Sequence, residues 1–326
     1  MSAVVCFGEA LIDFHAVDAD GPRRLPAFVP HPGGAPANVA VAVARLGGDV
    51  AFAGMLGRDM FADMLLRDLA DAGVDTGLVR RTDAANTALA FVALDADGER
   101  SFSFYRPPAA DLLFRDSDFD DRALAAAAIF HAGSCSLTEP GIADTTLSGM
   151  RRARAGGALV SFDMNLRPAL WPRDADPAPR LWAALELADL VKLSAEEFAF
   201  LAVRAGGEAQ ACTRLWQGAT RLLLVTDGAR PLRWFAPDAT GRFDPFAVRA
   251  VDSTGAGDAF VGGFLLALAE HGIDAAALPA FADDDDRRDA GLRFAAACGA
   301  LAVGRVGSFA AMPDRLAVER FLETHA

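Results

Sequence analysis

Residues 252–270 read DSTGAGDAFVGGFLLALAE and hold the most specific pattern of the chain. The second part predicts a helix, because Phe260, Phe264 and Leu268 recur along one helical face. Three small residues at positions 255–257 open directly onto the start of that helix. Backbone N–H groups at a helix start, together with the helix dipole, favour a bound anion. The stretch therefore predicts a turn and helix that bind a negatively charged group.

Short apolar runs alternate with amphipathic helical segments over the rest of the chain. This alternation favours an α/β fold, in which helices cover a largely parallel sheet. The predicted strands are residues 3–8, 50–55, 128–133, 158–163, 189–193 and 221–226. The predicted helices are residues 36–46, 59–72, 140–155, 194–204, 207–217, 256–270 and 288–302.

Two segments interrupt this alternation. Residues 11–30 are extended and rich in proline, and residues 87–106 predict a hairpin turning at Asp97-Gly98. Phe102 and Phe104 alternate with serines on the second strand of that hairpin, which gives it one apolar face. We expect both segments to form a small sheet over the mouth of the main sheet. A half-apolar sheet needs a partner, which would be substrate or a second subunit.

Composition narrows the class of protein. The chain has 326 residues and a formal charge of −13, which argues against a nucleic-acid partner because phosphate backbones need clustered basic residues. Its only lysine is Lys192. The four cysteines lie far apart and form no metal or disulfide pattern, which fits a reducing compartment. We see no signal peptide or membrane span, and we interpret residues 283–289 (DDDDRRD) as a solvated loop.

Asp258 stands at the edge of the predicted anion site. A first-turn aspartate often does no more than stabilise its helix, but its place beside Gly-Ala-Gly favours a catalytic role. The positive helix end should keep it ionised at pH 7, so that it can take the proton of an alcohol that attacks a phosphoryl group. The stretch lacks the third glycine of a dinucleotide fingerprint, because Phe260 stands there, and the chain has no Gly-Lys pair of a P-loop.

A second glycine-rich stretch, PGGAPANVA at residues 32–40, predicts another turn before a helix. Gly33 and Gly34 allow close approach of the backbone, and Pro36 suits the first helical turn. Asn38 offers both a donor and an acceptor. This is a neutral site suited to sugar hydroxyls, although the same pattern also occurs in plain loop-to-helix turns.

The two stretches together resemble the signatures of the ribokinase (PfkB) carbohydrate kinase family. Gly33-Gly34 with Asn38 and Gly47 resembles the first signature, and residues 252–258 with Gly262-Gly263 resemble the second. The resemblance runs from Val4 to about Glu323. Within the family, FGEALIDF (7–14), FYRPPAADLLF (104–114), SFDMNLRPALW (161–171) and VKLSAEE (191–197) look most like fructokinases.

This resemblance implies a fold and an activity. The fold would be a ribokinase-like, doubly wound, mostly parallel sheet flanked by helices, with a small β-sheet lid. Residues 1–326 would form a single catalytic domain, with the lid made by inserts at about 11–30 and 87–108. The activity would be ATP-dependent transfer of the γ-phosphoryl group to a hydroxyl of a small carbohydrate, D-fructose giving fructose 6-phosphate. We expect a cytoplasmic enzyme and a homodimer formed through the lid.

The resemblance also implies roles for residues by position. Asp258 would be the base, and the amides of Gly255, Ala256 and Gly257 would form the anion hole. Arg106, on the lid hairpin, would reach the sugar or the phosphates, and Arg167 would assist. The residues expected to bind sugar hydroxyls are Asp13, Gly33, Gly34 and Asn38. The residues expected around the nucleotide are Lys192, Ser194, Glu197, Thr226 and Gly228, with Gly255 and Gly257.

Two cations follow from the same resemblance. Glu197 would act through water on Mg²⁺, although Ser194 stands where family members often have asparagine. Asp252 and Thr254 would hold K⁺, with carbonyls of residues 302–307 as the second half of that site. Residues 295–297 are alanines where fructokinases commonly show an asparagine near adenine, so adenine contacts there would be apolar or made by backbone.

Other functions remain open at this level. 2-Keto-3-deoxygluconate kinases share the SFDMNLRPALW-like stretch, and a sugar acid would want a positive group or a tyrosine near the lid, where Tyr105 and Arg106 stand. Ribokinases and nucleoside kinases come next. A sugar-responsive binding protein without activity would be expected to lose the base or the glycines, and both are present. A nicotinamide oxidoreductase fails on the missing fingerprint.

Overall fold

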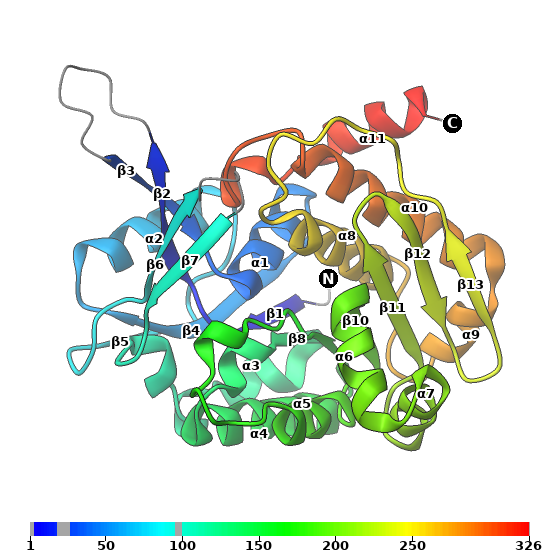
Figure 1. The fold of residues 1–326 in the computed structure, drawn as a ribbon, viewed down its shortest axis with the longest axis horizontal. Helices are drawn as coiled ribbons and strands as arrows, with labels where there is room; N and C mark the ends of the chain where they lie inside the picture. Colours follow the sequence, from blue (N-terminus) through cyan, green and yellow to red (C-terminus); the bar gives the residue numbers. More distant parts are fainter. Residues whose placement is uncertain (1–2, 18–26, 95–99, 326) are drawn as a thin grey trace.

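Two β-sheets form the framework of the chain (Figure 1). The computed structural model describes residues 3–17, 27–94 and 100–325. The nine-stranded sheet has the order β13-β12-β11-β10-β9-β8-β1-β4-β5, and the four-stranded sheet has the order β3-β2-β6-β7. The α/β fold with a large, mostly parallel sheet and a separate small sheet is therefore confirmed.

The strands of the large sheet come from the whole length of the chain. They are β1 (Ala3–Phe7), β4 (Val50–Gly57), β5 (Val79–Thr82), β8 (Ala127–Gly133), β9 (Leu159–Asp163), β10 (Leu190–Ser194), β11 (Leu222–Asp227), β12 (Arg230–Phe235) and β13 (Thr240–Phe243). Neighbouring strands from β11 to β5 pair in parallel, and β12 and β13 add an antiparallel edge. All six predicted strands are present, and β5, β12 and β13 were not predicted.

Helices cover both faces of the large sheet (Figure 1). One face carries α1 (Ala35–Arg45), α2 (Met60–Asp71), α8 (Ala256–Glu270), α9 (Leu278–Asp283), α10 (Asp285–Ala302) and α11 (Arg315–Thr324). The other face carries α3 (Asp121–Ala126), α4 (Pro140–Ala155), α5 (Ala178–Leu185), α6 (Ala195–Ala205) and α7 (Glu208–Gln217). A separate apolar core lies under each layer, so the sheet is doubly wound.

The strand order reverses at the centre of the large sheet. From β1 the chain first adds β4 and β5 on one side, and later adds β8, β9, β10 and β11 on the other. Crossovers on the two sides of β1 therefore diverge, which leaves a crevice outside the carboxyl ends of β1 and β8. Open α/β sheets bind their ligands at this switch point.

The small sheet is made by the two segments that interrupt the α/β alternation. It contains β2 (Leu11–Val17), β3 (Ala27–Gly33), β6 (Leu89–Leu94) and β7 (Arg100–Tyr105). β2 pairs antiparallel with β3 and parallel with β6, and β6 pairs antiparallel with β7. The predicted turn at Asp97-Gly98 lies outside the described residues. Phe14 stacks on Phe91 with ring centroids 5.0 Å apart, and Tyr105 contacts the same Phe91 ring.

Glycines let α8 lie tightly between two other helices. A Cβ atom on Gly262 would stand 2.5 Å from Cβ of Ala42 in α1, and one on Gly263 would stand 2.8 Å from Sγ of Cys298 in α10. Side chains at these positions would therefore push both neighbours away. This packing brings the start of α8 next to the start of α1, where the candidate site forms.

The acidic stretch at residues 283–289 differs from its prediction as a loop. α9 ends at Asp283, and α10 begins at Asp285 with the side chain of Asp284 accepting from the amide of Arg287. Arg288 is buried and its guanidinium lies 3.7 Å from the ring centroid of Trp234. The aspartates thus form a helix N-terminus, which negative charge stabilises. None of the helices among the described residues is long and apolar enough to cross a membrane.

Candidate active site

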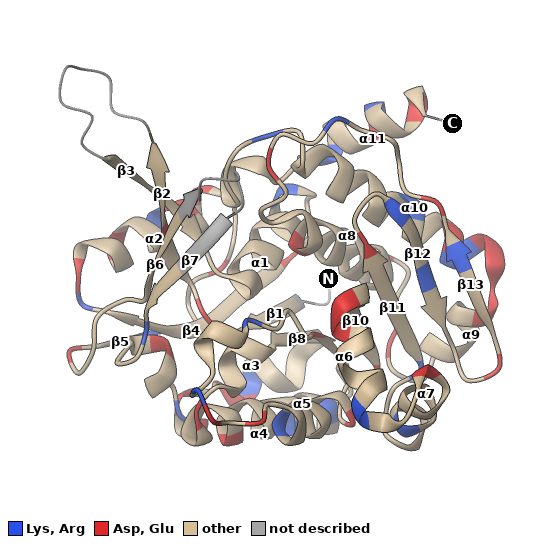
Figure 2. Cartoon of the chain, viewed as in Figure 1, with Lys and Arg blue, Asp and Glu red and all other residues tan. Residues whose placement is uncertain are grey.

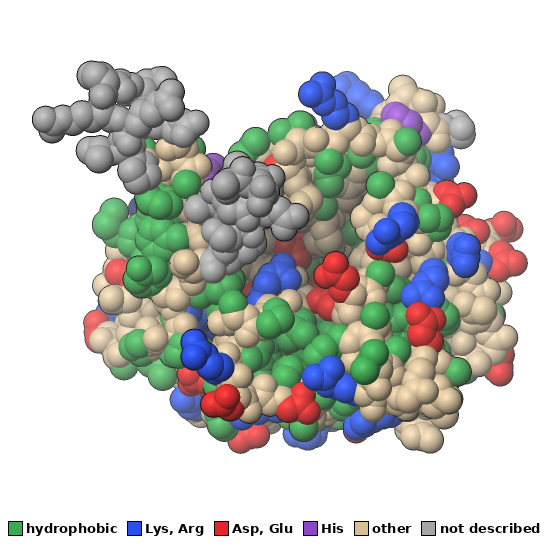
Figure 3. Space-filling view, in the orientation of Figure 1, with side chains coloured by type: hydrophobic (Ala, Val, Ile, Leu, Met, Phe, Trp, Pro, Cys, Tyr) green, Lys and Arg blue, Asp and Glu red, His purple; other side chains and the backbone are tan. Residues whose placement is uncertain are grey.

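A cavity of about 490 Å³ opens at the switch point of the large sheet, below the small sheet. Figure 3 shows this face hollowed near its centre, with charged side chains of both signs around the hollow. The lining residues come from both sheets and both helix layers: Glu9, Leu11, Asp13, Gly34, Ala35, Asn38, Phe104, Arg106, Cys135, Asn165, Leu166, Arg167, Leu170, Lys192, Ser194, Glu196, Glu197, Ser253, Thr254, Gly255, Gly257, Asp258 and Ser308. Most of the predicted site residues therefore share one cavity.

Asp258 and Asn38 meet where the first turns of α8 and α1 converge. Nδ2 of Asn38 donates to Oδ2 of Asp258 at 2.7 Å, although the two residues are 220 positions apart in the sequence. Both side chains are buried. Oδ1 of Asn38 has no hydrogen-bond partner within the described part of the chain. Asn38 therefore holds the predicted base in place as well as lining the cavity.

The electrostatics of Asp258 differ from the prediction. The pKa of Asp258 is raised to about 6: burial and then the charge of Asp163 raise it, while the hydrogen bond from Asn38 and the charges of Lys192 and Arg167 lower it. The helix end therefore does not hold this pKa in its ordinary range, because loss of water costs the carboxylate more. At pH 7 the group is still mostly ionised, as a general base requires.

The loop before α8 shapes the predicted anion hole. Gly255 precedes the helix with φ +77°, a left-handed conformation that suits glycine. Gly255 and Gly257 line the cavity, and the amide of Gly257 makes no hydrogen bond within the residues described here. Ala256 differs, because its amide donates to the carbonyl of Ser253 at 3.3 Å and the residue does not line the cavity.

Lys192 brings a positive charge to the same loop. A Cβ atom on Gly257 would stand 3.2 Å from Nζ of Lys192, so the ammonium lies directly over this glycine. Nζ is paired with Asp163, at 3.0 Å from Oδ2 and 3.2 Å from Oδ1. Burial lowers the pKa of Lys192, but Asp163 and Glu197 outweigh this and the net pKa is raised. The chain's single lysine is thus held charged beside the predicted anion hole.

Glu197 is fixed by two backbone amides. It caps α6 together with Ser194: Oε2 accepts from the amide of Ser194 at 2.8 Å, and Oγ of Ser194 accepts from the amide of Glu197 at 3.1 Å. Oε1 accepts from the amide of Leu166 at 2.6 Å. Figure 2 shows the acidic start of α6 facing the centre of the molecule. Each oxygen keeps a lone pair for water.

The predicted sugar side of the cavity is built from β2, β3 and the start of α1. The pKa of Asp13 is raised to about 7: burial raises it most, the charge of Arg167 lowers it, and the charges of Asp258 and Glu9 raise it. The Asp13 carboxylate lies directly against Gly33, where a Cβ atom would collide with Oδ2. Gly34 has φ +107°, and a Cβ atom there would stand 2.5 Å from the carbonyl oxygen of Glu9. Gly34 is therefore required by close approach of the backbone, whereas a side chain at position 33 would displace the Asp13 carboxylate.

The two arginines differ in their surroundings. Arg106 is buried just after β7, and its Nε donates to Oδ2 of Asp111 at 2.7 Å. Arg167 is exposed on the cavity wall, where Nη1 donates to the carbonyl of Leu166 at 3.3 Å. Tyr105, beside Arg106, is 67% exposed and does not line the cavity.

Some predicted residues lie outside the cavity lining. Thr226 is the last residue but one of β11, with its hydroxyl 3.4 Å from the carbonyl of Leu193, and Gly228 lies in the following turn with φ +60°. Asp252 is buried, accepting from the amide of Thr254 at 2.8 Å and from the amide of Gly307 at 3.1 Å. Ala295 and Ala297 are buried in α10 and Ala296 is partly exposed, and none of the three lines the cavity.

Several polar residues that line the cavity or pair with a residue lining it were not predicted. Glu9 is buried after β1; Oε1 accepts from the amide of Ala35 at 3.2 Å, and Oε2 has no hydrogen-bond partner in the described structure. Asn165 is the one non-glycine residue among those described with positive φ, at 39°. Asp163 pairs with Lys192 across adjacent strands. The sequence signal was weak, because each is a single polar residue inside a stretch that matched the family as a whole.

The fold and the cavity define a class of protein. A carboxylate sits at the start of a buried helix, beside a glycine loop and a lysine that favour an anion, at the switch point of a doubly wound sheet. This arrangement is that of a phosphotransferase with a small alcohol acceptor. The pfkB family carbohydrate kinase model matches residues 1–315. The chain belongs to the pfkB family of carbohydrate kinases, which confirms the resemblance found in the sequence.

Individual relatives are similar over nearly the whole chain. Fructokinase-1 of Oryza sativa subsp. japonica is 42% identical over 322 residues, which covers 98% of each chain. The ATP-bound structure of a Xylella fastidiosa fructokinase is 55% identical with a TM-score of 0.94, and covers 99% of this chain and 98% of the other. A Vibrio cholerae O395 fructokinase with bound fructose, ADP and calcium is 32% identical with a TM-score of 0.84, and covers 99% of each chain.

Proposed function

We propose that the protein is a fructokinase that transfers the γ-phosphoryl group of ATP to a hydroxyl of D-fructose, giving fructose 6-phosphate. The observation that carries this proposal is the Asn38–Asp258 contact, which holds a buried carboxylate between the sugar side of the cavity and the glycine loop. The fructokinase relatives, including those with bound ATP or fructose, support the choice of both substrates.

The chemistry at Asp258 is removal of one proton. A sugar hydroxyl placed beside Oδ1 or Oδ2 becomes acidic as its oxygen bonds to the phosphorus of the γ-phosphoryl group. Asp258 takes that proton while the bond between the same phosphorus and the β-phosphate bridging oxygen breaks. Asp13 and Asn38 would orient the sugar by hydrogen bonds. The attacking hydroxyl is then held beside the phosphorus, which lowers the entropic cost of bringing the two reactants together.

The charge that develops on the phosphoryl oxygens would be stabilised by the start of α8. Gly255, Gly257 and Lys192 line this part of the cavity, so two backbone amides and the ammonium would donate to these oxygens. Within the described residues no group of three or more acidic, histidine or cysteine side chains could hold a metal directly. A cavity with few direct protein ligands suits Mg²⁺, because this ion keeps several of its waters and binds mainly to the phosphates of the nucleotide. The Glu197 carboxylate, with a lone pair left on each oxygen, would hold one of these waters, and Mg²⁺ would supply further positive charge at the phosphates.

Asp252 and Thr254 would form half of a K⁺ site. The Asp252 carboxylate bridges the amides of Thr254 and Gly307, and the amide of Asp252 itself donates to the carbonyl of Val303 at 3.1 Å. The two segments expected to supply ligands, residues 252–254 and 302–307, are therefore adjacent. A bound cation here would order the loop that carries Gly255.

The small sheet would act as a lid on a single catalytic domain and as a dimer contact. Phe28, Val29 and Val17 are each about 40% exposed on it, which leaves apolar surface for a second copy of the chain. We infer a cytoplasmic location from the four cysteines, which are all free thiols buried in the fold.

A panel of acceptors tests the proposal. ADP release from ATP and Mg²⁺ is measured with D-fructose, 2-keto-3-deoxygluconate, D-ribose and adenosine, with and without K⁺, and the product is identified by mass and NMR. We expect the highest kcat/KM with fructose, phosphorylated at O6. Preferred turnover of any other acceptor would overturn the assignment of fructose.

A further inference from the structure

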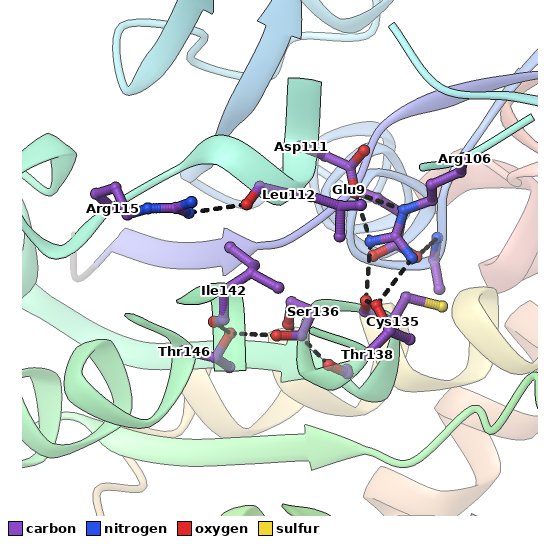
Figure 4. A network of polar contacts seen from close by, with 12 residues as sticks. Glu9, Arg106, Asp111, Leu112, Arg115, Cys135, Ser136, Thr138, Ile142 and Thr146 are labelled. Atoms are coloured by element: carbon purple, nitrogen blue, oxygen red, sulfur yellow. Dashed lines mark hydrogen bonds and ion pairs between the residues drawn. The ribbon is translucent and has the colours of Figure 1, made fainter. Parts of the chain in front are cut away.

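Arg106 sits at the sugar end of the cavity with its charge already matched by an acidic partner. Nε and Nη2 both contact Oδ2 of Asp111, Nη2 donates to the carbonyl of Cys135 at 2.8 Å, and Nη1 reaches Oγ1 of Thr138 at 3.5 Å. Figure 4 shows the guanidinium between Asp111 and the Cys135–Thr138 segment, with Glu9 beside it. The side chains of Arg106 and Asp111 are 2% and 3% exposed, so water does not screen this pair.

Asp111 comes from the 3-10 helix at Ala110–Leu113, directly after the small sheet. One of its oxygens, Oδ1, has no hydrogen-bond partner among the described residues, while the other takes both contacts from the guanidinium. Arginine cannot lose its proton in a protein, so nearby carboxylates must offset its charge. Glu9 lies beside the guanidinium, but Asp111 is the carboxylate that forms the buried ion pair with it, so this pair sets most of the charge that Arg106 presents at the sugar end of the cavity.

The rest of the cavity offers little positive charge to a sugar. Lys192 is paired with Asp163 at the phosphate end. Arg167 lines the cavity and lowers the pKa of Asp13, but its side chain is exposed, so water screens its charge. The acidic residues that line the cavity are Glu9, Asp13, Glu196, Glu197 and Asp258. An acceptor that carried its own carboxylate would meet these groups with no unmatched buried cation nearby, and like charges in a desolvated site cost several kcal/mol.

We propose that Asp111 is a specificity-determining residue, which makes the cavity select neutral sugars and reject sugar acids by neutralising Arg106. This proposal rests on the proposed function, since it concerns the acceptor of the same reaction. Asp111 acts through Arg106, so it is a positioning residue and not a catalytic one.

The test compares two ligands that differ by one charge. D-glucitol and D-gluconate have the same chain of hydroxyls and differ only at C1, where one has an alcohol and the other a carboxylate. Their dissociation constants are measured by calorimetry for the wild type and for Asp111→Asn, which keeps an acceptor for Arg106 and removes the charge. Asp111→Ser repeats the test with a smaller side chain, and Asp111→Glu keeps the charge.

We expect the wild type to bind glucitol more tightly than gluconate, and Asp111→Asn to shift the ratio of the two constants towards gluconate by at least about tenfold. A unit charge roughly 6 Å from a carboxylate, at an effective dielectric constant of about 20, is equivalent to about 100-fold before screening. Asp111→Glu should keep the wild-type ratio. So should Asp49→Asn, which removes one exposed charge beyond the far end of α1.

Several results would overturn the proposal. A purely structural role for Asp111 predicts weaker binding of both ligands with an unchanged ratio in Asp111→Asn and Asp111→Ser. If neither variant folds, wild-type gluconate binding at least as tight as glucitol binding refutes the proposal, and clear preference for glucitol supports it. Because these are binding measurements, they stand apart from the fructose assay: a wild type that does not phosphorylate fructose would sink the proposed function alone.

Discussion

Removal of the Asn38 amide should move the pH dependence of catalysis. Asn38→Ala deletes the 2.7 Å hydrogen bond to Oδ2 of Asp258, and this bond is one of the interactions that lower the pKa of Asp258 from the value that burial alone would give. A hydrogen bond to a charged group contributes about 1.5–3 kcal/mol, which corresponds to about 1–2 pKa units. The pKa of Asp258, about 6 in the folded protein, should therefore rise to roughly 7–8 in the variant.

The consequence for turnover follows from the fraction of ionised base. At pH 7 this fraction should fall from about 0.9 to between about 0.1 and 0.5, so kcat/KM should fall about 2- to 10-fold from this effect and recover as the pH approaches 9. The assay is kcat/KM for fructose between pH 5 and 9, with ADP quantified by chromatography so that no coupling enzyme adds its own pH dependence.

Asp258→Asn is the control. Without the base, kcat/KM should be low and should not fall further as the pH is lowered, so the acid limb of the pH profile should be absent. Loss of sugar contacts in Asn38→Ala would raise KM at every pH and leave the limb in place. If the acid limb of Asn38→Ala coincides with that of the wild type, the Asn38 bond does not tune the base and this account of the site is wrong.

Three further predictions follow from the same geometry. Asp258→Asn should lower kcat by about 10²–10⁴-fold. It should also stabilise the fold at pH 7 by about 2–3 kcal/mol, because the folded pKa of about 6 exceeds the ordinary aspartate value of 3.8; the gain should be complete above pH 6 and vanish near pH 4 in urea titrations. Lys192→Met should lower kcat at least about tenfold with little change in the fructose KM. Adding Asp163→Asn removes the carboxylate that Lys192→Met leaves unpaired, so it should restore stability but not turnover. Restored turnover would contradict a role of Lys192 at the phosphoryl group. Gly34→Ala should destabilise the protein more than Gly47→Ala, as measured by thermal unfolding. Both glycines have positive φ, but only at Gly34 would a Cβ atom stand against backbone atoms. Equal losses of stability in the two variants would rule out that clash.

The large elements of the fold follow from local sequence. Buried parallel strands have nearly continuous apolar runs, so β1, β4 and β8–β11 were predictable. The edge strand β13 alternates exposed and half-buried residues, and β12 begins with two exposed residues, so both have a weak local signal. That signal is completed by the pairing of β12 with β11 and of β13 with β12. Residues 283–289 read as a solvated run, because the burial of Arg288 against Trp234 depends on a contact made far along the chain.

The candidate site divides in the same way. Asp258, Asn38 and the glycines stand in dense motifs, so their types and spacing could be recognised. Asp163 and Lys192 are 29 residues apart and meet only because β9 and β10 are neighbours in register. Asp111 is only five residues from Arg106, but the pairing depends on how the chain turns after β7. Contacts that depend on the strand order or on the path of a loop could therefore not be predicted from the sequence.

A single lysine gives this enzyme an unusual response to reagents that attack amines. Apart from the α-amino group, only Lys192 can be acylated, and its side chain is 11% exposed and ion-paired with Asp163. Acylation of Lys192 at neutral pH should therefore be slow, and bound nucleotide should slow it further. The rate of acylation at Nζ would then measure how much of the cavity is occupied. Attachment of this protein to a surface or a dye through lysine would therefore modify the cavity itself. The arginines on the rest of the surface do not react with such reagents.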